Sequence, residues 1–285
     1  MSHTGRCPLD FEVWPEAIEL GRLFAEQGYE LALVGGPVRD LLLHRKSHDL
    51  DFCSSARPEQ FEPILRRWGH DGFWDMGRKF GTLGAMRRRA DGTEVKVEVT
   101  TYRSDTYDPD SRKPEVNYGD TLEGDLSRRD FTVNAMALRV PDLEFVDPFG
   151  GASDLAKGVL RTPVDPSQSF DDDPLRMMRA VRFVAQLGFS IAPDAAEAIS
   201  SMRDRIEIVS AERVRDELTK MLLSDRPRAG LEALVESGLA DIVFPEIPAL
   251  QLQIDEHHRH KDVFEHTMIV LERAIALETG PYGPV

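Results

Sequence analysis

Apolar residues recur along this chain at two spacings, which predict strands and helices in turn. Between residues 58 and 68, Phe61, Ile64, Leu65 and Trp68 follow helical spacing, so that they share one face of a helix. The run 31–34 is short and continuously apolar, as expected of a buried strand. By the same criteria, helices are predicted over 14–27, 38–43 and 58–68, and strands over 31–34, 50–54, 80–86 and 94–103.

The pattern changes after residue 146. The segment VDPFGGASDLAKGVLRTP is rich in turn-forming residues and marks the end of a first domain. Beyond Ser169 the spacing of apolar residues is helical for the rest of the chain. The pattern therefore predicts an α+β fold, with strands and helices in the first part and helices only in the second.

The turn after the first strand has the residues of a phosphate site. Gly35 and Gly36 end the strand where backbone N–H groups come close to another group, and Arg39 adds a fixed positive charge. Asp49 lies 13 residues beyond Gly36, which leaves room for a helix and a turn before the chain returns as a strand. The loop is neither a P-loop, since no Gly-Lys-Ser/Thr follows, nor a dinucleotide loop, since Gly-x-Gly-x-x-Gly is absent.

Two aspartates begin the next strand. Asp49 and Asp51 share a strand face because successive side chains alternate, so together they can hold one or two Mg²⁺ ions. An isolated Asp-x-Asp usually lies on a solvated turn, and the prediction depends on its combination with the glycine turn. Two such ions would activate a 3′-hydroxyl and neutralise leaving pyrophosphate. The combination predicts metal-dependent nucleotidyl transfer.

Other charged residues suit the same chemistry. In the strand 94–103, alternation puts Lys96, Glu98 and Thr100 on one face, so Glu98 is a candidate third carboxylate, although a solvent-facing strand residue fits the pattern equally well. Arg128 and Arg129 precede an apolar run. They suit either a helix cap and surface charge or the binding of a triphosphate.

Composition narrows the class of protein. The 285 residues are 41% hydrophobic and carry a net charge of −15, which argues against a broad nucleic-acid footprint. Any such contact must be local, and the run of Arg87, Arg88 and Arg89 is a candidate, unless it is a solvated hairpin tip. Two cysteines exclude a disulfide framework. Without a signal peptide or long apolar run, we expect a cytoplasmic enzyme with neither membrane nor DNA as partner.

A second polar motif opens the helical part. In SFDDDPLRMMRAVRFVAQLGF, Asp173, Arg176, Arg179 and Arg182 recur every three residues and form a polar stripe on a predicted helix. Leu175, Met178, Val181 and Val184 form the opposite side. A surface helix has the same pattern. An aspartate and an arginine one turn apart can also hydrogen-bond the edge of a nucleotide base.

Taken in order, these motifs resemble a known family. LVGGPVRD with DLD, RRDFTVNAMAL, DPFGGASDL, DDDPLRMMRAVRF with QLGF, and SAERVRDELTKMLLS occur in the order seen in bacterial class II tRNA nucleotidyltransferases and their poly(A) polymerase relatives, of the polymerase-β-like superfamily. The resemblance covers roughly residues 30–240. It implies a nucleotidyltransferase head with a small mixed β-sheet over 1–165, a helical neck and body over 166–245, and a further helical segment over 246–285. The implied reaction adds CMP and AMP to the tRNA 3′ end, from CTP and ATP.

The resemblance also implies roles for single residues. Gly35, Gly36 and Arg39 would hold the triphosphate, Asp49 and Asp51 the Mg²⁺ ions, and Arg129 would support the nucleotide. Asp173 and Arg176 would read the base edge of CTP or ATP, with Arg179 and Arg182 supporting base and phosphates. The loop 102–122, with Lys113, Pro114 and Val116, resembles a flexible loop that could control the change from C to A. Asp172 departs from the family pattern, which usually has glutamate there.

The C-terminal segment resembles the start of an HD-type phosphohydrolase domain. His257, His258, His260 and His266 lie close together, but the defining His-Asp pair is absent, so we expect no hydrolase activity. An ordinary helix entry with exposed imidazoles fits equally well. We expect a partial sequence, with 245–285 weakly anchored and weak tRNA affinity.

Three functions remain open on the sequence alone. The first is CCA addition. The second is a relative that adds only CC, only A, or poly(A). The third is a non-catalytic RNA-binding descendant, against which the retained aspartates, glycines and base-reading pair argue.

Overall fold

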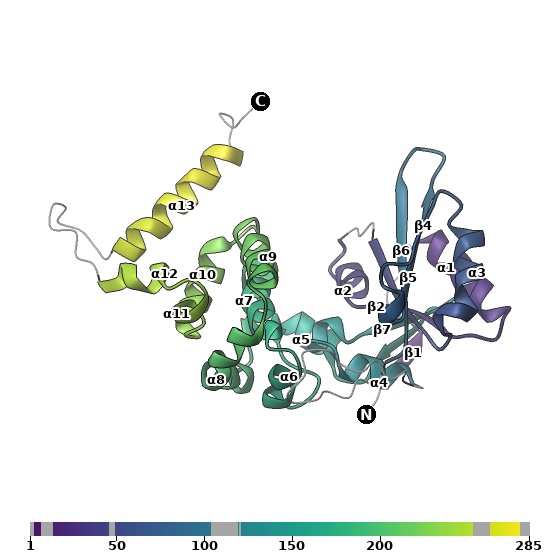
Figure 1. The fold of residues 1–285 in the computed structure, drawn as a ribbon, viewed down its shortest axis with the longest axis horizontal. Coiled ribbons are helices and arrows are strands. Elements are labelled where there is room, and N and C mark those ends of the chain that lie inside the picture. Colours follow the sequence, from purple (N-terminus) through teal and green to yellow (C-terminus); the bar gives the residue numbers. More distant parts are fainter. Residues whose placement is uncertain are drawn as a thin grey trace. The chain divides into compact units, whose positions relative to one another are not determined.

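The computed structural model describes residues 3–6, 14–45, 49–103, 119, 121–252 and 263–279, with the backbone alone for 3–6 (Figure 1). The chain forms two compact units. The first comprises residues 1–157 and 161–164, and the second comprises residues 158–160 and 165–285. The division into 1–165, 166–245 and 246–285 stays a prediction.

The first unit is built on a mixed sheet of eight strands in the order β1-β8-β7-β2-β3-β6-β5-β4. Only β3 and β6 pair in parallel, and the other neighbours are antiparallel. The strands are β1 His3–Arg6, β2 Leu31–Val34, β3 Asp49–Ser54, β4 Gly72–Trp74, β5 Thr82–Arg88, β6 Glu94–Thr101, β7 Ala137–Val140 and β8 Glu144–Asp147. The helices are α1 Pro15–Ala25, α2 Gly36–Leu42, α3 Pro58–Trp68, α4 Leu122–Ser127 and α5 Gly151–Lys157, with short 3₁₀ turns η1 Arg78–Phe80 and η2 Thr132–Asn134.

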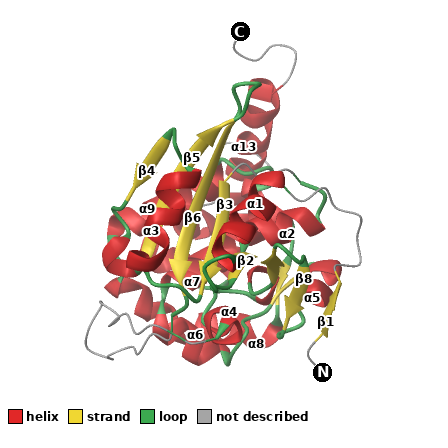
Figure 2. Ribbon diagram, turned by 90° about the vertical axis from the view of Figure 1, so that its right-hand side faces the viewer, coloured by secondary structure: helices red, strands yellow, loops and turns green. Residues whose placement is uncertain are grey.

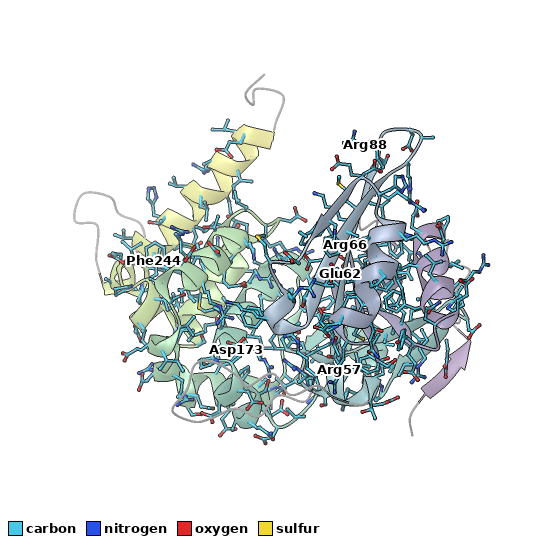
Figure 3. All side chains as sticks on the ribbon, turned by 45° about the vertical axis from the view of Figure 1, so that its right-hand side comes forward. Arg57, Glu62, Arg66, Arg88, Asp173 and Phe244 are labelled. Atoms are coloured by element: carbon cyan, nitrogen blue, oxygen red, sulfur yellow. The ribbon has the colours of Figure 1, made fainter. Side chains whose placement is uncertain are left out.

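Helices α1 and α3 cover one face of this sheet (Figure 1). Phe24 of α1 and Phe61 of α3 are fully buried, with ring centroids 6.0 Å apart. The helix predicted over 58–68 is confirmed, and its apolar residues form the buried side. Its outer side is polar, where Glu62 and Arg66 pair one turn apart at 2.8 Å (Figure 3). Because this side of α3 packs on the sheet, alternate residues of the strands point toward the helix. The residues between them point to the opposite face of the sheet.

The opposite face of the sheet is covered only in part. Ala32, Val34 and Cys53 pack beneath Leu122 and Leu126 of α4. Cys53 lies on the same face as Asp49 and Asp51, since β3 alternates. The cover by α4 thus ends beside Asp51, and the two aspartates at the start of β3 are exposed. The fold leaves the polar part of this face open.

The second unit is mostly helical. Its helices are α6 Pro166–Asp172, α7 Leu175–Leu187, α8 Pro193–Met202, α9 Ala211–Leu222, α10 Pro227–Glu236, α11 Ala240–Val243, α12 Glu246–Ala249 and α13 Val263–Thr279, with 3₁₀ turns η3 Arg203–Ile208 and η4 Leu250–Leu252. Two short parallel strands, β9 Val159–Leu160 and β10 Ser190–Ile191, also belong to it. The all-helical expectation is therefore corrected in this detail, because Val159 and Leu160 find backbone partners in the segment after α7.

The arginine run at the end of β5 does not form a free basic patch. Arg87 pairs with Glu19 at 2.8 Å, Arg88 with Glu94 at 2.7 Å and Arg89 with Glu16 at 2.6 Å. The hydrogen bond from Arg89 lowers the pKa of Glu16. These pairs offset the charge of the run, and those of Arg87 and Arg89 join the end of β5 to α1. A polynucleotide contact at this run stays a prediction.

Two predicted features fall outside the described residues. They are most of the loop 102–122, including Lys113, Pro114 and Val116, and the histidines His257, His258 and His260. His266 lies on α13. Across the described part of the chain, no helix combines the length and apolar character needed to cross a bilayer.

Candidate active site

Three carboxylates lie on the open face of the first unit. Strands β3 and β6 are neighbours in the sheet (Figure 2), and their parallel pairing sets Asp51 opposite Glu98 and Asp49 opposite Lys96. All four side chains are exposed, whereas Leu50, Val97 and Val99 between them are buried. The alternation predicted for 94–103 is therefore observed, and it brings Glu98 to the face of the two aspartates.

Ionisation of the Asp51 carboxyl group is less favourable in the folded protein than in water. Although it is open to solvent, surrounding atoms displace enough water to raise its pKa, and the Glu98 carboxylate raises the pKa further. Arg129 acts in the opposite direction, and Asp49 adds to the rise. A cation bound between these groups would relieve this repulsion.

Two hollows adjoin the carboxylates, and both include Asp51 and Glu98 in their walls. The first has a volume of about 350 Å³. Its charged walls are Asp51, Glu98, Arg103, Asp125, Arg128 and Arg129. The second, of about 390 Å³, is lined by Asp49, Leu50, Asp51, Trp74, Lys96 and Glu98. Asp51 and Glu98 thus lie between the two hollows. The first hollow is lined by arginines, and the second has the aromatic ring of Trp74 in its wall.

The glycine turn contacts Arg129, one of the arginines that line the first hollow. Gly35 has a φ of 73°, a conformation that a residue with a side chain rarely adopts. A Cβ atom at Gly35 would lie 2.9 Å from Nη1 of Arg129, so this guanidinium rests against the backbone of the turn. The helix predicted over 38–43 begins earlier, at Gly36, with Pro37 in its first turn. The turn and Arg129 therefore form one structure.

Buried acidic and amide groups hold the arginines in place. Arg129 donates to Oδ2 of Asp125 at 3.0 Å, and Asp125 is buried. Arg39 donates to Oδ1 of Asp40 and, at 2.8 Å, to Oδ1 of Asn134. The Arg39 side chain is 12% exposed, so its guanidinium mainly joins α2 to the η2 turn. A role in holding the triphosphate stays a prediction for Arg39.

Sequence reasoning did not single out Asp125 or Asn134. Asn134 also donates to Oδ1 of Asp130 at 3.0 Å. The hydrogen bond that it accepts from Arg39 links RRDFTVN to the GGPVRD turn. Asp125 and Asn134 both lie in charge-rich motifs, and this is the feature of the sequence that could have pointed to them. Asp125 and Arg129 lie one helical turn apart, whereas Asn134 and Arg39 are 95 residues apart and only the folded protein brings them together.

The carboxylates suit a cation that arrives with phosphate. Among the described residues, no group of three or more His, Cys, Asp or Glu side chains is arranged to hold a metal ion by itself. Mg²⁺ commonly uses one or two carboxylates and completes its shell with substrate phosphates and water. Asp49 and Asp51, on one face and beside an arginine-lined hollow, fit that mode of binding.

The predicted base-reading residues lie in the second unit (Figure 3). Asp173 is not on the helix with the arginines, as the stripe implied, because Pro174 starts a new helix after α6 ends. Asp173 is half-buried, and its Oδ1 accepts from the N–H of Leu175, the first residue of α7, at 3.2 Å. Its other oxygen lies 3.5 Å from Arg213.

The three arginines on α7 differ in their surroundings. Arg176 is buried, not on a polar face, and donates to Oγ of Ser169 at 2.8 Å. Arg182 pairs with Glu217 of α9 at 2.5 Å and lies over the ring of Phe183. Arg179 is half-buried, and its guanidinium carbon is 5.9 Å from the same ring. Arg176 and Arg182 thus brace the helices, and their nucleotide roles stay predictions.

Two family models match the chain. Residues 31–161 match the Poly A polymerase head domain, and residues 188–250 match the probable RNA and SrmB- binding site of polymerase A. The chain is 37% identical over 233 residues to the CCA-adding enzyme of Lactobacillus johnsonii, covering 81% of this chain and 56% of that protein. It is 36% identical over 238 residues to that of Bacillus subtilis, covering 83% and 56%.

Solved structures agree with the sequence relatives. The Bacillus stearothermophilus CCA-adding enzyme in complex with CTP has a TM-score of 0.68 and 36% identity, covering 79% of this chain and 52% of that chain. The Thermotoga maritima CCA-adding enzyme complexed with tRNA_CCA has a TM-score of 0.73 and 27% identity, covering 96% and 60%.

These matches identify the family of the chain and show how much of its relatives' length the chain spans. The chain spans a little over half the length of the curated relatives it matches. Polymerase-β-like nucleotidyltransferases typically use divalent metal ions. The chain belongs to the family of class II CCA-adding enzymes and poly(A) polymerases, and its residues 31–161 are the head domain of that family.

Proposed function

We propose that this protein adds CMP and AMP, without a template, to the 3′ end of tRNA, using CTP, ATP and Mg²⁺. The observation that carries the proposal is the register of β3 and β6, which sets Asp51 opposite Glu98 beside the arginine-lined hollow. The similarity to CCA-adding enzymes supports the choice of tRNA as acceptor.

The residues of the first unit divide the chemistry between them. Mg²⁺ held by Asp49 and Asp51 would activate the 3′-hydroxyl and neutralise charge on the leaving pyrophosphate. Arg129 and Arg128 line the hollow as fixed positive charges and would bind the triphosphate. The turn at Gly35 and Gly36 presents backbone beside Arg129, and Arg39 keeps α2 in position through Asn134. Glu98 would act as the third carboxylate.

In the second unit, Asp173 and Arg176 would read the base edge, and Arg179 and Arg182 would support base and phosphates. The N–H of Arg176 donates to the carbonyl of Asp173 at 3.0 Å, and Ser169 fixes the Arg176 guanidinium. This anchoring keeps the Asp173 carboxylate, which accepts hydrogen bonds, and the Arg176 guanidinium, which donates them, at fixed positions relative to each other. A base with the wrong edge would leave buried polar groups unmatched, which is the source of selectivity.

Replacement of Asp173 by alanine should damage base choice more than catalysis. We expect the ratio of kcat/KM for CTP to that for UTP to fall at least about tenfold, because a hydrogen-bonding acceptor is lost. The measurement is single-nucleotide addition to a tRNA transcript that lacks CCA. Asp171→Ala is the matched control, since it removes only an exposed pair with Arg205. An unchanged ratio in Asp173→Ala would exclude base reading by this residue.

Replacement of Gly35 by alanine should impair the triphosphate turn. Gly35 has φ 73° and ψ −134°, a backbone conformation that is open to glycine and strained for a residue with a side chain, and the added Cβ would also push on Nη1 of Arg129. We expect kcat/KM for CTP to fall at least about tenfold. Gly92→Ala is the control, because Gly92 has a φ of 87° and nothing within 4 Å of the added Cβ. Equal losses of activity in both variants would contradict the account.

The test of the function uses three tRNA transcripts, ending before CCA, after CC, or complete. Each is incubated with Mg²⁺ and CTP, ATP or both, and products are resolved at single-nucleotide resolution. Addition of C, C and A followed by a stop supports the proposal. Arrest at CC, addition of A alone, or a long tail assigns the protein to a CC-adding, A-adding or poly(A) relative instead. No addition to any transcript contradicts it.

A further inference from the structure

The second hollow has a wall made by residues from four adjacent strands. Trp74 of β4 pairs with Gly84 of β5, Gly84 with Glu98 of β6, and Glu98 with Asp51 of β3. Side chains at paired positions of neighbouring strands point to the same face of a sheet. Trp74 and the carboxylates therefore lie in one row, which crosses β4, β5, β6 and β3 in the order seen in Figure 2.

Because glycine has no side chain, Gly84 leaves room for the indole of Trp74 to extend along this row. A Cβ atom at Gly84 would lie 2.0 Å from Cε2 of Trp74, so the ring rests directly on the strand at that point. Nε1 of Trp74 donates to Oε1 of Glu98 at 3.3 Å. The indole is half-buried and lines the hollow. Glu98 and Gly84 thus fix an aromatic surface beside the catalytic carboxylates.

The two hollows differ in charge. The arginine-lined hollow offsets Asp51, Glu98 and Asp125 with Arg103, Arg128 and Arg129. The second hollow sets a single cation, Lys96, against Asp49, Asp51 and Glu98. A triphosphate carries several negative charges and suits the first hollow. The second suits a group with an aromatic base and one phosphodiester, because it offers one ring and one ammonium.

We propose that the second hollow binds the 3′-terminal nucleotide of the RNA acceptor, with its base stacked on Trp74 and its 5′-phosphate near Lys96. This inference rests on the proposed function. In phosphoryl transfer, the attacking and leaving oxygens lie roughly in line on opposite sides of the phosphorus. Two hollows that share Asp51 and Glu98 suit this requirement, since one would receive the triphosphate and the other the attacking hydroxyl. Stacking on an aromatic ring is available to every base.

The test compares Trp74→Ala and Trp74→Phe in steady-state addition of CMP to RNA. Trp74→Ala should raise KM for the RNA about tenfold or more while KM for CTP changes less than about twofold. Trp74→Phe should keep most of the RNA affinity, because phenylalanine still stacks although it cannot donate to Glu98. Met76→Ala is the control, since Met76 is 86% exposed and is not among the residues that line the hollow. Lys96→Gln should raise KM for the RNA in the same direction.

Several outcomes would overturn the inference. Trp74→Ala with unchanged KM for RNA would do so, as would equal rises for RNA and CTP. Loss of kcat in Trp74→Phe as severe as in Trp74→Ala would instead assign Trp74 to positioning Glu98 alone. Circular dichroism must first establish that each variant is folded, and Trp74→Phe keeps the test decisive if Trp74→Ala is not.

A photocrosslink separates this inference from the proposed function. RNA that carries 4-thiouridine as its terminal nucleotide should crosslink to peptides containing Trp74 or Lys96, whether or not nucleotides are added. A crosslink confined to other peptides contradicts the subsite even in an active enzyme. If the wild-type chain adds no nucleotide but the crosslink forms at Trp74, the proposed function fails and the RNA subsite stands.

Discussion

Asp51→Asn should lower kcat with every nucleotide by at least about a thousandfold and leave the fold intact. Asparagine keeps the shape of the side chain but removes the charge that would hold Mg²⁺ opposite Glu98. The measurement is single-turnover addition of CMP and of AMP to matched transcripts. Asp91→Asn, at the exposed tip between β5 and β6, is the control and should keep wild-type rates. Residual activity within tenfold of wild type would exclude Asp51 as a metal ligand.

The same variant should also be at least as stable as the wild type near neutral pH. Because the pKa of Asp51 is raised in the folded protein, ionisation of this group opposes folding above its unfolded pKa. Asparagine removes that penalty, so Tm should be equal or higher at pH 7. The difference should disappear as pH falls below the unfolded pKa, where the wild-type group is protonated in both states. A lower Tm at pH 7 would contradict the electrostatic description of the site.

Arg129→Gln should lower kcat/KM for CTP at least about a hundredfold, chiefly through a higher KM for the nucleotide. The guanidinium lines the hollow, rests against Gly35 and forms a hydrogen bond with Asp125 at 3.0 Å. The variant should also lose stability, since it leaves the carboxylate of Asp125 buried without its cation. Initial rates at varied CTP and a thermal melt measure the two effects.

A double variant separates binding from folding at this position. Asp125→Asn combined with Arg129→Gln removes both charges, so Tm should recover toward that of the wild type. Activity should stay low, because the cation for the triphosphate is still absent. Recovery of activity together with Tm would mean that Arg129 has only a structural role.

The sequence predicted the local parts of this site well. The glycine turn, the strand of Asp49 and Asp51, and the alternation that carries Glu98 depend on neighbouring residues, and the structure has each of them. Their local spacing is fixed by strand and helix geometry. The boundary of α2 was the less accurate part, because Pro37 is compatible with the first turn of a helix and so did not delay its start.

The rest of the site depends on contacts between distant segments. The row from Trp74 to Asp51 follows from the register of four strands, which no short window of sequence contains. Arg176 and Arg182 have the periodicity of a polar face, yet Ser169 and Glu217 bind them within the helical unit. The spacing of arginines in the sequence is the same whether the side chains are buried with a partner or exposed on a polar face.

The most direct test of the central claim is the balance of the reaction. The protein is incubated with Mg²⁺, a tRNA transcript that lacks CCA, and CTP labelled at the α-phosphate in one reaction and at the γ-phosphate in a parallel one. The first label counts incorporated CMP and the second counts released pyrophosphate. The account predicts one pyrophosphate for each CMP added and no incorporation when a chelator removes the metal. Release of inorganic phosphate in place of pyrophosphate, or incorporation that persists with the chelator, would contradict metal-dependent nucleotidyl transfer at Asp49 and Asp51.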